Sequence, residues 1–480
     1  MVVLLMSCTL VNGLTNVPPT ISVTNVSFTP TTGSTATSRV PTPVSTATLM
    51  APTATSTASV PSDAVVVNTL EQGVYPFNPN GKCALGEAIQ SVLLQQAVDG
   101  CVLPPGSKTV YMPTGTYSLT EPDNAPVILF GKPQSDREHL DPAGFPVIAG
   151  TVTILGNDSV IQRSGSNQFG IFQVFIGGNL TLKDLTISGG DVSATHHPGG
   201  AIENLGGSLA LVHVTLSHNM AYNGGALDIA GGINAENTVT GSTITQNTAL
   251  VDGGGIHNAG HLLVKQSVIS SNIAKDGVFG GGGIDNDGQD AQLTLDDSQV
   301  FGNSATLGGG IFNDGGTVNI TDQSLLSGNL ATWKFNGLSP DGGGGINSRA
   351  DNDQLVIDQS LVIGNQAPAS FGGGIIAGGQ KTTITGSVFS GNIAGTGSAL
   401  EITGGEVSVT GSCILDNQSL LPKSYNGIEN DNSLAVDASQ NWWGTKGPSV
   451  SADVKTASQM ANPPVFCASS LPTPYPTLNP

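Results

Sequence analysis

The sequence predicts an all-β fold, a right-handed single-stranded parallel β-helix, which is a solenoid of about eleven coils with a short N-terminal capping helix. Three repeating features predict it: short glycine runs, strands of alternating polarity that follow them, and asparagines at regular spacing. Glycine makes up 65 of 480 residues, about twice its average share of roughly 7%. Self-similarity of this kind is the signature of repeat architectures.

The glycine motif is a run of glycines or other small residues that ends in an apolar residue. An alternating strand follows it, as in Leu293-Thr294-Leu295 or Val318-Asn319-Ile320. The motif occurs at Gly199–Ile202, Gly224–Leu227, Gly253–Ile256, Gly281–Ile284, Gly308–Ile311, Gly343–Ile346, Gly372–Ile375 and Gly397–Leu400.

The asparagines recur at intervals of 25 to 36 residues, which is the length of one coil of several short strands. We expect each to occupy a corner that requires the left-handed backbone conformation, with its amide bonded to its neighbours in a ladder. They are interpreted as structural rather than catalytic residues. The series is Asn219, Asn247, Asn272, Asn303, Asn329, Asn365, Asn392 and Asn417.

No helical pattern separates these strands, so the chain lacks the crossover helices of an ordinary parallel sheet. A solenoid solves this problem because each strand pairs with its equivalent one coil away, about 4.8 Å along the axis. The inward isoleucine, leucine and valine side chains then stack into apolar columns.

The two open ends of a solenoid need covers. Apolar residues at three- and four-residue intervals predict one amphipathic helix over residues 85–97, the natural N-terminal cap. Two short strands are expected around Pro113-Thr114-Gly115. The sequence Asn441-Trp442-Trp443-Gly444 closes the last coil or, alternatively, forms a platform on which a carbohydrate stacks.

Composition divides the chain into five parts. The segment 15–62 is almost wholly Ser, Thr, Pro, Val and Ala, and such a tract buries too little apolar area to fold. The expected parts are a truncated signal with a lipobox (1–14), a disordered stalk (15–62), an N-terminal cap (63–120), the parallel β-helix (121–450) and a C-terminal tail with a Pro/Thr-rich end (451–480).

The net charge of −20 and the pI of about 4.4 disfavour nucleic acid as a partner, because the field of the protein repels phosphate backbones. No apolar run reaches the roughly 18 residues of a membrane span. We expect a monomer that is extracellular or at the cell surface, with a glycan or another cell-surface ligand as its partner.

Five cysteines fit export to an oxidising compartment. Cys8 follows Leu5, Met6 and Ser7 as in a bacterial lipoprotein signal, so it is a lipidation candidate unless that resemblance is accidental. The other four are disulfide candidates, Cys83 with Cys101 and Cys413 with Cys467. The alternative is five unpaired buried thiols.

The repeats resemble those of the chlamydial polymorphic outer-membrane proteins, in which a glycine motif accompanies an apolar residue three positions before an asparagine. Here that second motif reads Val300-Phe301-Gly302-Asn303 or Phe389-Ser390-Gly391-Asn392. Residues Cys83-Ala-Leu-Gly-Glu-Ala88 are similar to the CSLREA motif of secreted β-helix proteins, with Gly86 in place of its arginine, which puts in doubt any ion pair that this arginine makes. The resemblance covers about residues 63–450 and implies a pectin lyase-like fold and export. It does not imply an activity.

Acidic residues give a weak calcium candidate, since carboxylates are the ligands that this ion prefers. Counting back seven residues from the repeated asparagines predicts that three aspartates form one outward column on successive coils. The alternative is that they are simply solvated, and no other cofactor is expected. The candidates are Asp285, Asp287, Asp290, Asp296, Asp322 and Asp358.

No catalytic set is recognised in the sequence. The signatures of polygalacturonase-like enzymes are absent, and the histidines lack partners at zinc-like spacing. The favoured hypothesis is therefore an adhesin-like, ligand- or glycan-binding protein without enzymatic activity. The alternative is a polysaccharide-degrading lyase or glycoside hydrolase whose carboxylates come from the longest coil, around Asp341, Asp351 and Asp353.

Overall fold

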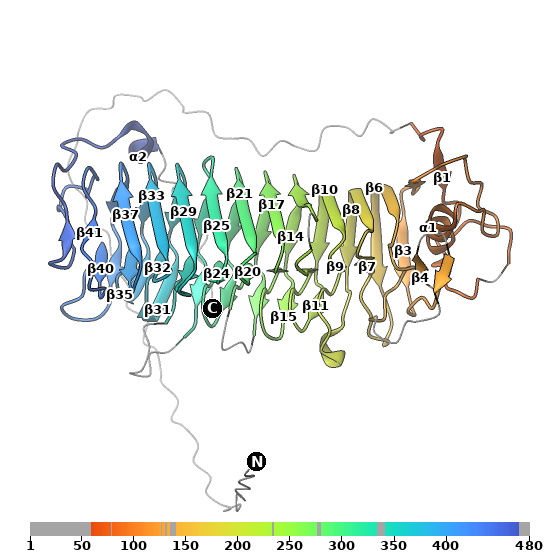
Figure 1. Ribbon diagram of the computed structural model, residues 1–480, viewed down its shortest axis with the longest axis horizontal. Coiled ribbons are helices and arrows are strands. Elements are labelled where there is room, and N and C mark those ends of the chain that lie inside the picture. Colours follow the sequence, from red (N-terminus) through yellow and green to blue (C-terminus); the bar gives the residue numbers. More distant parts are fainter. Residues whose placement is uncertain are drawn as a thin grey trace, which may run out of the picture. The chain divides into compact units, whose positions relative to one another are not determined.

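The computed structural model describes residues 59–77, 79–125, 127–129, 132–134, 141–232, 235–275, 280–333 and 341–469. These residues form a β-solenoid of about ten turns, in which parallel strands stack along one axis and helices are few (Figure 1). The prediction of a nearly all-β parallel solenoid is confirmed. Cys8 and most of the expected stalk lie outside the described residues.

Three parallel sheets run along the solenoid, and we name them the long sheet, the ten-stranded sheet and the eight-stranded sheet. The long sheet contains β1 (Ala64–Val66), β2 (Thr109–Tyr111), β3 (Thr116–Leu119), β6 (Thr151–Arg163), β8 (Asn179–Ser188), β10 (Ser208–Ser217), β13 (Asn237–Thr240), β14 (Thr243–Thr245), β17 (His261–Lys265), β18 (Val268–Ser270), β21 (Gln292–Asp296), β22 (Gln299–Phe301), β25 (Thr317–Thr321), β26 (Leu325–Ser327), β29 (Gln354–Asp358), β30 (Leu361–Ile363), β33 (Lys381–Thr385), β34 (Val388–Ser390), β37 (Glu406–Thr410), β38 (Cys413–Leu415), β41 (Val436–Asp437) and β42 (Val454–Lys455).

The ten-stranded sheet contains β7 (Phe172–Phe175), β9 (Ile202–Leu205), β12 (Leu227–Ile229), β16 (Ile256–Asn258), β20 (Ile284–Asp287), β24 (Ile311–Asp314), β28 (Ile346–Ser348), β32 (Ile375–Ala377), β36 (Leu400–Ile402) and β40 (Ile428–Asn430). The eight-stranded sheet contains β11 (Met220–Ala221), β15 (Thr248–Ala249), β19 (Ile273–Ala274), β23 (Ser304–Ala305), β27 (Leu330–Ala331), β31 (Gln366–Phe371), β35 (Ile393–Thr396) and β39 (Gln418–Ser419). Outside these sheets lie the antiparallel pair β4 (Val127–Leu129) and β5 (Lys132–Gln134), and the helices α1 (Leu85–Leu94), η1 (Ser193–Thr195) and α2 (Val465–Ser469).

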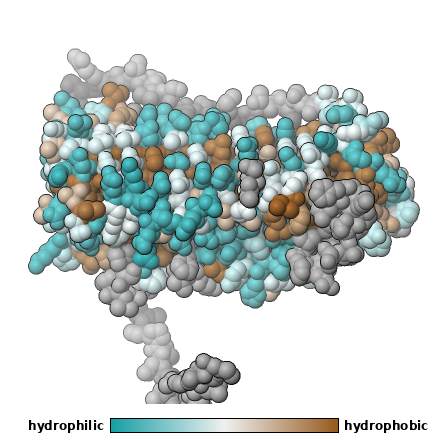
Figure 2. All heavy atoms as spheres, in the orientation of Figure 1, coloured by the Kyte–Doolittle hydropathy of each residue, from teal (hydrophilic) through white to brown (hydrophobic). Residues whose placement is uncertain are grey.

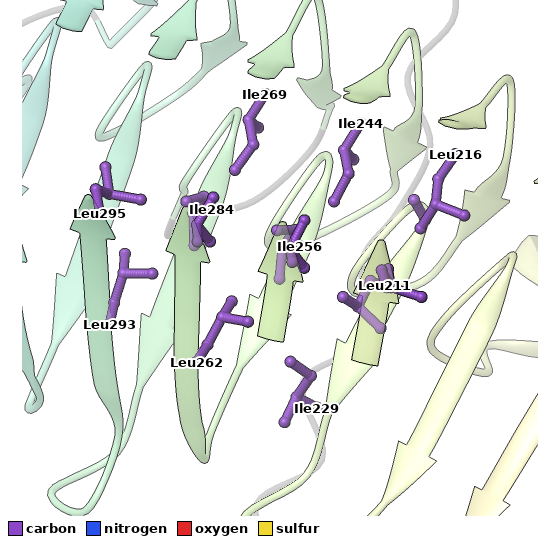
Figure 3. Packing of buried hydrophobic residues seen from close by; sticks show 14 of the residues in the cluster. Leu211, Leu216, Ile229, Ile244, Ile256, Leu262, Ile269, Ile284, Leu293 and Leu295 are labelled. Carbon is purple, nitrogen blue, oxygen red and sulfur yellow. The ribbon is translucent and has the colours of Figure 1, made fainter. Parts of the chain in front are cut away.

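Equivalent apolar residues lie in register on successive turns. Leu227 pairs with Ile256, Ile256 with Ile284, and Ile284 with Ile311. Figure 3 shows inward side chains of this core, Ile256 and Ile284 among them, stacked between the sheets. One cluster of buried residues extends from Val65 to Val454, and burying each isoleucine or leucine contributes about 1.5–3 kcal/mol. The apolar columns predicted from the repeats are therefore the core.

The repeated asparagines form an unbroken ladder inside one corner of the solenoid. Each side-chain Nδ2 donates to the Oδ1 of the next asparagine at 2.9–3.2 Å, from Asn219 to Asn417. The expected left-handed conformation belongs to a different residue, however. The residue before each asparagine has positive φ, as at His218 (56°), Gln246 (57°) and Gly302 (62°), because the turn is completed before the amide points inward.

Glycines make the tight corner before each strand of the ten-stranded sheet. The first glycine of the motif has a left-handed backbone, as at Gly281 with φ 74°. The second lies against the next turn, because a side chain on Gly282 would collide with the carbonyl of Gly309. The glycine runs therefore set the close spacing of the coils at this corner.

Helix α1 covers one end of the solenoid (Figure 1). It ends at Leu94, earlier than the residues 85–97 expected, because Gln95 adopts the left-handed conformation with φ 53°. A side chain on Gly86 would collide with the carbonyl oxygen of Gly73, so an arginine does not fit here. The long sheet extends back into this cap, because β1 pairs with β2, and both β2 and β3 pair with β6.

Candidate functional site

The outer face of the ten-stranded sheet carries a row of buried polar side chains. The first and third residues of each strand point into the core, and the second points outward. Most of these outward side chains are nevertheless buried. In order they are Gln173, Glu203, Asp228, His257, Asp285, Phe312, Asn347, Ile376, Glu401 and Glu429.

His257 lies between acidic residues of both neighbouring turns. Its Nδ1 is 2.7 Å from Asp228 Oδ1, and its Nε2 is 3.6 Å from carboxylate oxygens of Asp285 and Asp287. Burial alone would lower the pKa of His257, but its hydrogen bonds to Asp228 and Asp287 and the nearby charges raise it well above the usual value. The imidazolium therefore neutralises these acids, and its role is structural.

Two further buried acids lie in the same outward series. Burial, reinforced by the charge of Asp141, raises the pKa of Glu203 to about 8, although Gln173 Nε2 donates to its carboxylate at 2.5 Å. Burial likewise raises the pKa of Glu401 to about 9. Thr396 Oγ1 lies 2.8 Å from Glu401 Oε2 and 2.6 Å from Glu429 Oε2. Both acids are therefore largely protonated near neutral pH.

The predicted column of three aspartates is wrong. Asp296 pairs in register with Thr321, so Asp322 lies one residue past the equivalent position, at a turn where its φ is 52°. Lys265 Nζ binds Asp296 Oδ2 at 2.6 Å, and Asp358 accepts a hydrogen bond from Thr385 Oγ1. Asp296 and Asp358 therefore lie two turns apart, and each has a partner of its own.

Of the other calcium candidates, Asp285 and Asp287 lie beside the same atom, His257 Nε2, each at 3.6 Å. Asp285 is buried, whereas Asp287 and Asp290 are exposed. Among the residues that the structure describes, no three His, Cys, Asp or Glu side chains are arranged to hold a metal ion.

A groove of about 710 Å³ lies where the ten-stranded sheet turns toward the long sheet. Four glycines contribute to it, and those of one turn lie directly against those of the next, with no side chains between them. We name it the Arg349 groove; it is lined by Phe312, Asp314, Arg349, Ala350, Asp351, Gly378, Gly379, Gln380, Thr403, Gly404 and Gly405.

The longest coil supplies one wall of the Arg349 groove. Arg349 forms an ion pair with the buried Asp341. Asp353 is buried and accepts hydrogen bonds from the backbone N–H groups of Gly315 (2.6 Å) and Ala350 (3.0 Å), and burial raises its pKa to about 7. Of the three carboxylates named from the sequence, only Asp351 lines the groove, while Asp341 and Asp353 support its wall.

Sequence reasoning missed three residues of the groove, Phe312, Asp314 and Gln380. Asp314 and Asp351 are far apart along the chain and come together only through the pairing of β24 with β28. The signal that could have found them is the alignment of outward positions after each glycine motif, which places Asp314 opposite Arg349. Burial raises the pKa of Asp314, the charge of Asp287 adds to this, and that of Arg349 opposes it.

The four cysteines other than Cys8 form two disulfides, Cys83 with Cys101 beside α1 and Cys413 with Cys467 at the opposite end. Among the described helices, none is long and apolar enough to span a membrane. No protein-family model matches the chain, and no curated protein is significantly similar to it.

Proposed function

We propose that this chain is a non-enzymatic extracellular or cell-surface protein that binds a glycan in the Arg349 groove. The observation that carries the proposal is the composition of that groove. A guanidinium, two carboxylates and an amide surround a floor of glycines, with one aromatic ring beside them. Sugar hydroxyls both donate and accept hydrogen bonds, so a mixed set of fixed donors and acceptors suits them.

The acids elsewhere on this face favour binding over catalysis. His257 is held by carboxylates on both neighbouring turns, and Asp353 is bonded to backbone N–H groups. His257 and Asp353 are thus tied to the coils on either side of them and serve the packing of those coils. Hydrophilic residues dominate the face shown in Figure 2, which fits a protein that meets its ligands through polar contacts.

The proposal includes export, the right-handed winding and the count of eleven coils expected from the sequence. Right-handed crossovers are by far the commoner hand between parallel strands. The two disulfides support an oxidising compartment. The resemblance to CSLREA-type secreted β-helix proteins remains a prediction of the sequence.

A glycan array followed by titration calorimetry tests the proposal. Asp351 and Gln380 are exposed, so the double change Asp351→Ala and Gln380→Ala removes groove contacts without emptying the core. We expect a loss of about tenfold or more in affinity, which is about 1.4 kcal/mol. The matched control is Gln289→Ala with Asp290→Ala, two exposed residues outside the groove. Equal affinity in both variants would refute the groove as the site.

The alternative function is polysaccharide cleavage in the same groove. Asp314 favours it, because a carboxyl group with a raised pKa beside a second carboxylate resembles the acid of a glycosidase pair. An assay for reducing sugars and unsaturated products over a panel of polysaccharides decides between the two. Turnover that Asp314→Asn or Asp351→Asn abolishes would overturn the binding-only proposal.

A further inference from the structure

A second pocket lies at the C-terminal end of the solenoid, away from the Arg349 groove. It has a volume of about 200 Å³ and is lined by both tryptophans of the Asn441–Gly444 sequence, together with Asn417, Asp416 and Lys446. Pockets for drug-sized ligands are roughly 300–1,000 Å³, so this one suits a single ring.

The two tryptophans have different surroundings. Trp443 is 5% exposed and belongs to the main core cluster, so it closes the last coil. This is one of the two roles that the sequence suggested for the tryptophans. Trp442 is half-buried, follows Cys413 in register on the next turn, and packs in the small cluster around the Cys413–Cys467 disulfide. The pocket therefore has one wall fixed by the core and another fixed by a disulfide.

The asparagine ladder ends at this pocket. Each earlier asparagine donates both its backbone N–H and its Nδ2–H to the Oδ1 of the next one, as Asn392 does to Asn417 at 3.0 and 2.9 Å. Asn417 Nδ2 donates to Phe389 O, and no asparagine of a later turn accepts from Asn417 among the described residues. Counting on from Cys413, which lies opposite Trp442, puts Lys446 rather than an asparagine at the next ladder position, two residues after Gly444 with its φ of 71°.

A third donor belongs to the same lining. Trp443 Nε1 is buried and has no hydrogen-bond partner within the described part of the chain. An unpaired buried N–H costs about 1–3 kcal/mol, so buried donors normally have a partner. A residue that lines the pocket thus carries a buried indole N–H without an acceptor, and the ladder beside it lacks its next oxygen.

We propose that this end pocket binds an N-acetylated amino sugar of a glycan. The carbonyl oxygen of the acetamido group takes the place of the missing Asn Oδ1, and the pyranose ring packs against the indole of Trp442. The acetamido oxygen is an amide oxygen, like the asparagine Oδ1 that accepts in each rung of the ladder. A neutral group is favoured over a carboxylate, because Asp416 and Lys446 offset each other and the chain carries a net charge of −20.

The test is titration of the full chain with the β-1,4-linked trimer of N-acetylglucosamine and with the β-1,4-linked trimer of glucose, in which a hydroxyl group replaces each acetamido group. We expect the acetylated trimer to bind at least tenfold more tightly, and the indole N–H resonance of Trp443 to shift downfield as it saturates. Equal binding of the two trimers, or an unmoved Trp443 resonance, would show that this pocket does not recognise the acetamido group.

The decisive variant is Trp443→Phe, which removes the unpaired N–H and leaves an aromatic ring in the core. It should lose fivefold or more in affinity for the acetylated trimer while the variant still melts in one cooperative transition. The matched control is Trp333→Phe, because Trp333 Nε1 is also unpaired among the described residues but lies outside the pocket. Unchanged affinity in Trp443→Phe would overturn the proposal.

The end pocket and the Arg349 groove are separate sites, so the experiments can refute one proposal without refuting the other. The double change of Asp351 and Gln380 to Ala should leave binding of the acetylated trimer unchanged. If that change abolishes it, the trimer binds in the groove, and the end-pocket proposal is wrong while the proposed function stands.

Discussion

A single asparagine of the ladder connects three successive turns through its side chain. Asn303 is fully buried, and its Oδ1 accepts from Asn272 N at 2.9 Å and from Asn272 Nδ2 at 3.1 Å. Its Nδ2 donates to Asn329 Oδ1 and to Ile269 O, both at 3.0 Å. No other side chain of similar size both donates and accepts in this way at one point.

Asn303→Ala leaves several buried donors and acceptors without partners. We expect it to lower the free energy of unfolding by about 3 kcal/mol or more, because each unpaired buried group costs roughly 1–3 kcal/mol. Chemical denaturation followed by circular dichroism measures the effect. Asn319→Ala, on the half-buried outer face of β25, is the control and should change stability by about 0.5 kcal/mol at most. Similar effects in the two variants would argue against the ladder as a main support.

Glu401 makes stability depend on pH. Its pKa is raised from 4.5 to about 9, so the folded chain holds a proton that the unfolded chain releases. This contribution is complete below about pH 4.5 and is lost as pH rises toward about 9, by up to roughly 1.4 kcal/mol per pH unit.

Glu401→Gln removes this titration while it keeps the shape of the side chain. The melting temperature of the native chain should fall between pH 5 and pH 9, and the fall should be smaller in the variant. A residual slope of the same sign is expected, because the pKa values of Glu203 and Asp353 are raised as well. Parallel curves for the two proteins would contradict the prediction.

At the scale of single residues, the sequence predicts the ladder but not the aspartate positions. Regular intervals identify Asn219 to Asn417, because a ladder requires the same residue at each corner. Counting back from those corners fails at Asp322, since the turn at Asp322 and Gln323, both with positive φ, adds one residue between strand and corner. A local irregularity of this kind leaves no trace in spacing alone.

At the scale of elements, α1 combines a predictable pattern with an unpredictable contact. Its apolar periodicity and the bond from Ala84 N to Glu87 Oε2 at 2.8 Å mark where it begins. Its end at Leu94 and the need for Gly86 follow from tertiary contacts that sequence does not show. Gly86 N donates to Gln72 O at 3.0 Å, which brings the helix directly against another segment of backbone.

Gly86→Ala should therefore destabilise the cap. In an ordinary helix interior, alanine is about 1 kcal/mol more favourable than glycine. Here the added methyl group collides with the carbonyl of Gly73, so we expect a loss of about 1–3 kcal/mol. Thermal denaturation shows directly whether the substitution raises or lowers stability. A higher melting temperature in the variant would show that the cap has room to move.

At the scale of the whole molecule, each turn contacts mainly its two neighbours, so the solenoid tolerates the loss of a complete turn. Deletion of residues 366–392 removes the 27 residues between two rungs and joins Asn365 to Ile393, where Asn392 stood before. We expect a folded monomer with native-like circular dichroism. Deletion of residues 366–379, about half a turn, should give an unfolded or aggregated chain, because it shifts the core pattern out of register. Equal folding of both deletions would contradict the stacking of equivalent positions.

The sequence predicts the solenoid because the glycine motifs and the asparagines repeat along it. The Arg349 groove instead depends on which loops come together once the coils are stacked. Phe312 and Asp314 come from one turn and Gln380 from another, and only the register of β24, β28 and β32 aligns those turns. Because the loops differ in length, the sequence alone does not show which residues of successive turns lie opposite one another.

The rung between Asn329 and Asn365 has an ordinary length of 2.9 Å although 36 residues separate its ends, against 25 to 31 for most other rungs. The corner therefore keeps its geometry although the coil from Asn329 to Asn365 is ten residues longer than the 26-residue coil from Asn303 to Asn329. Coils of different length can thus be exchanged without changes in adjacent turns, so ligand preference can diversify while the scaffold stays constant.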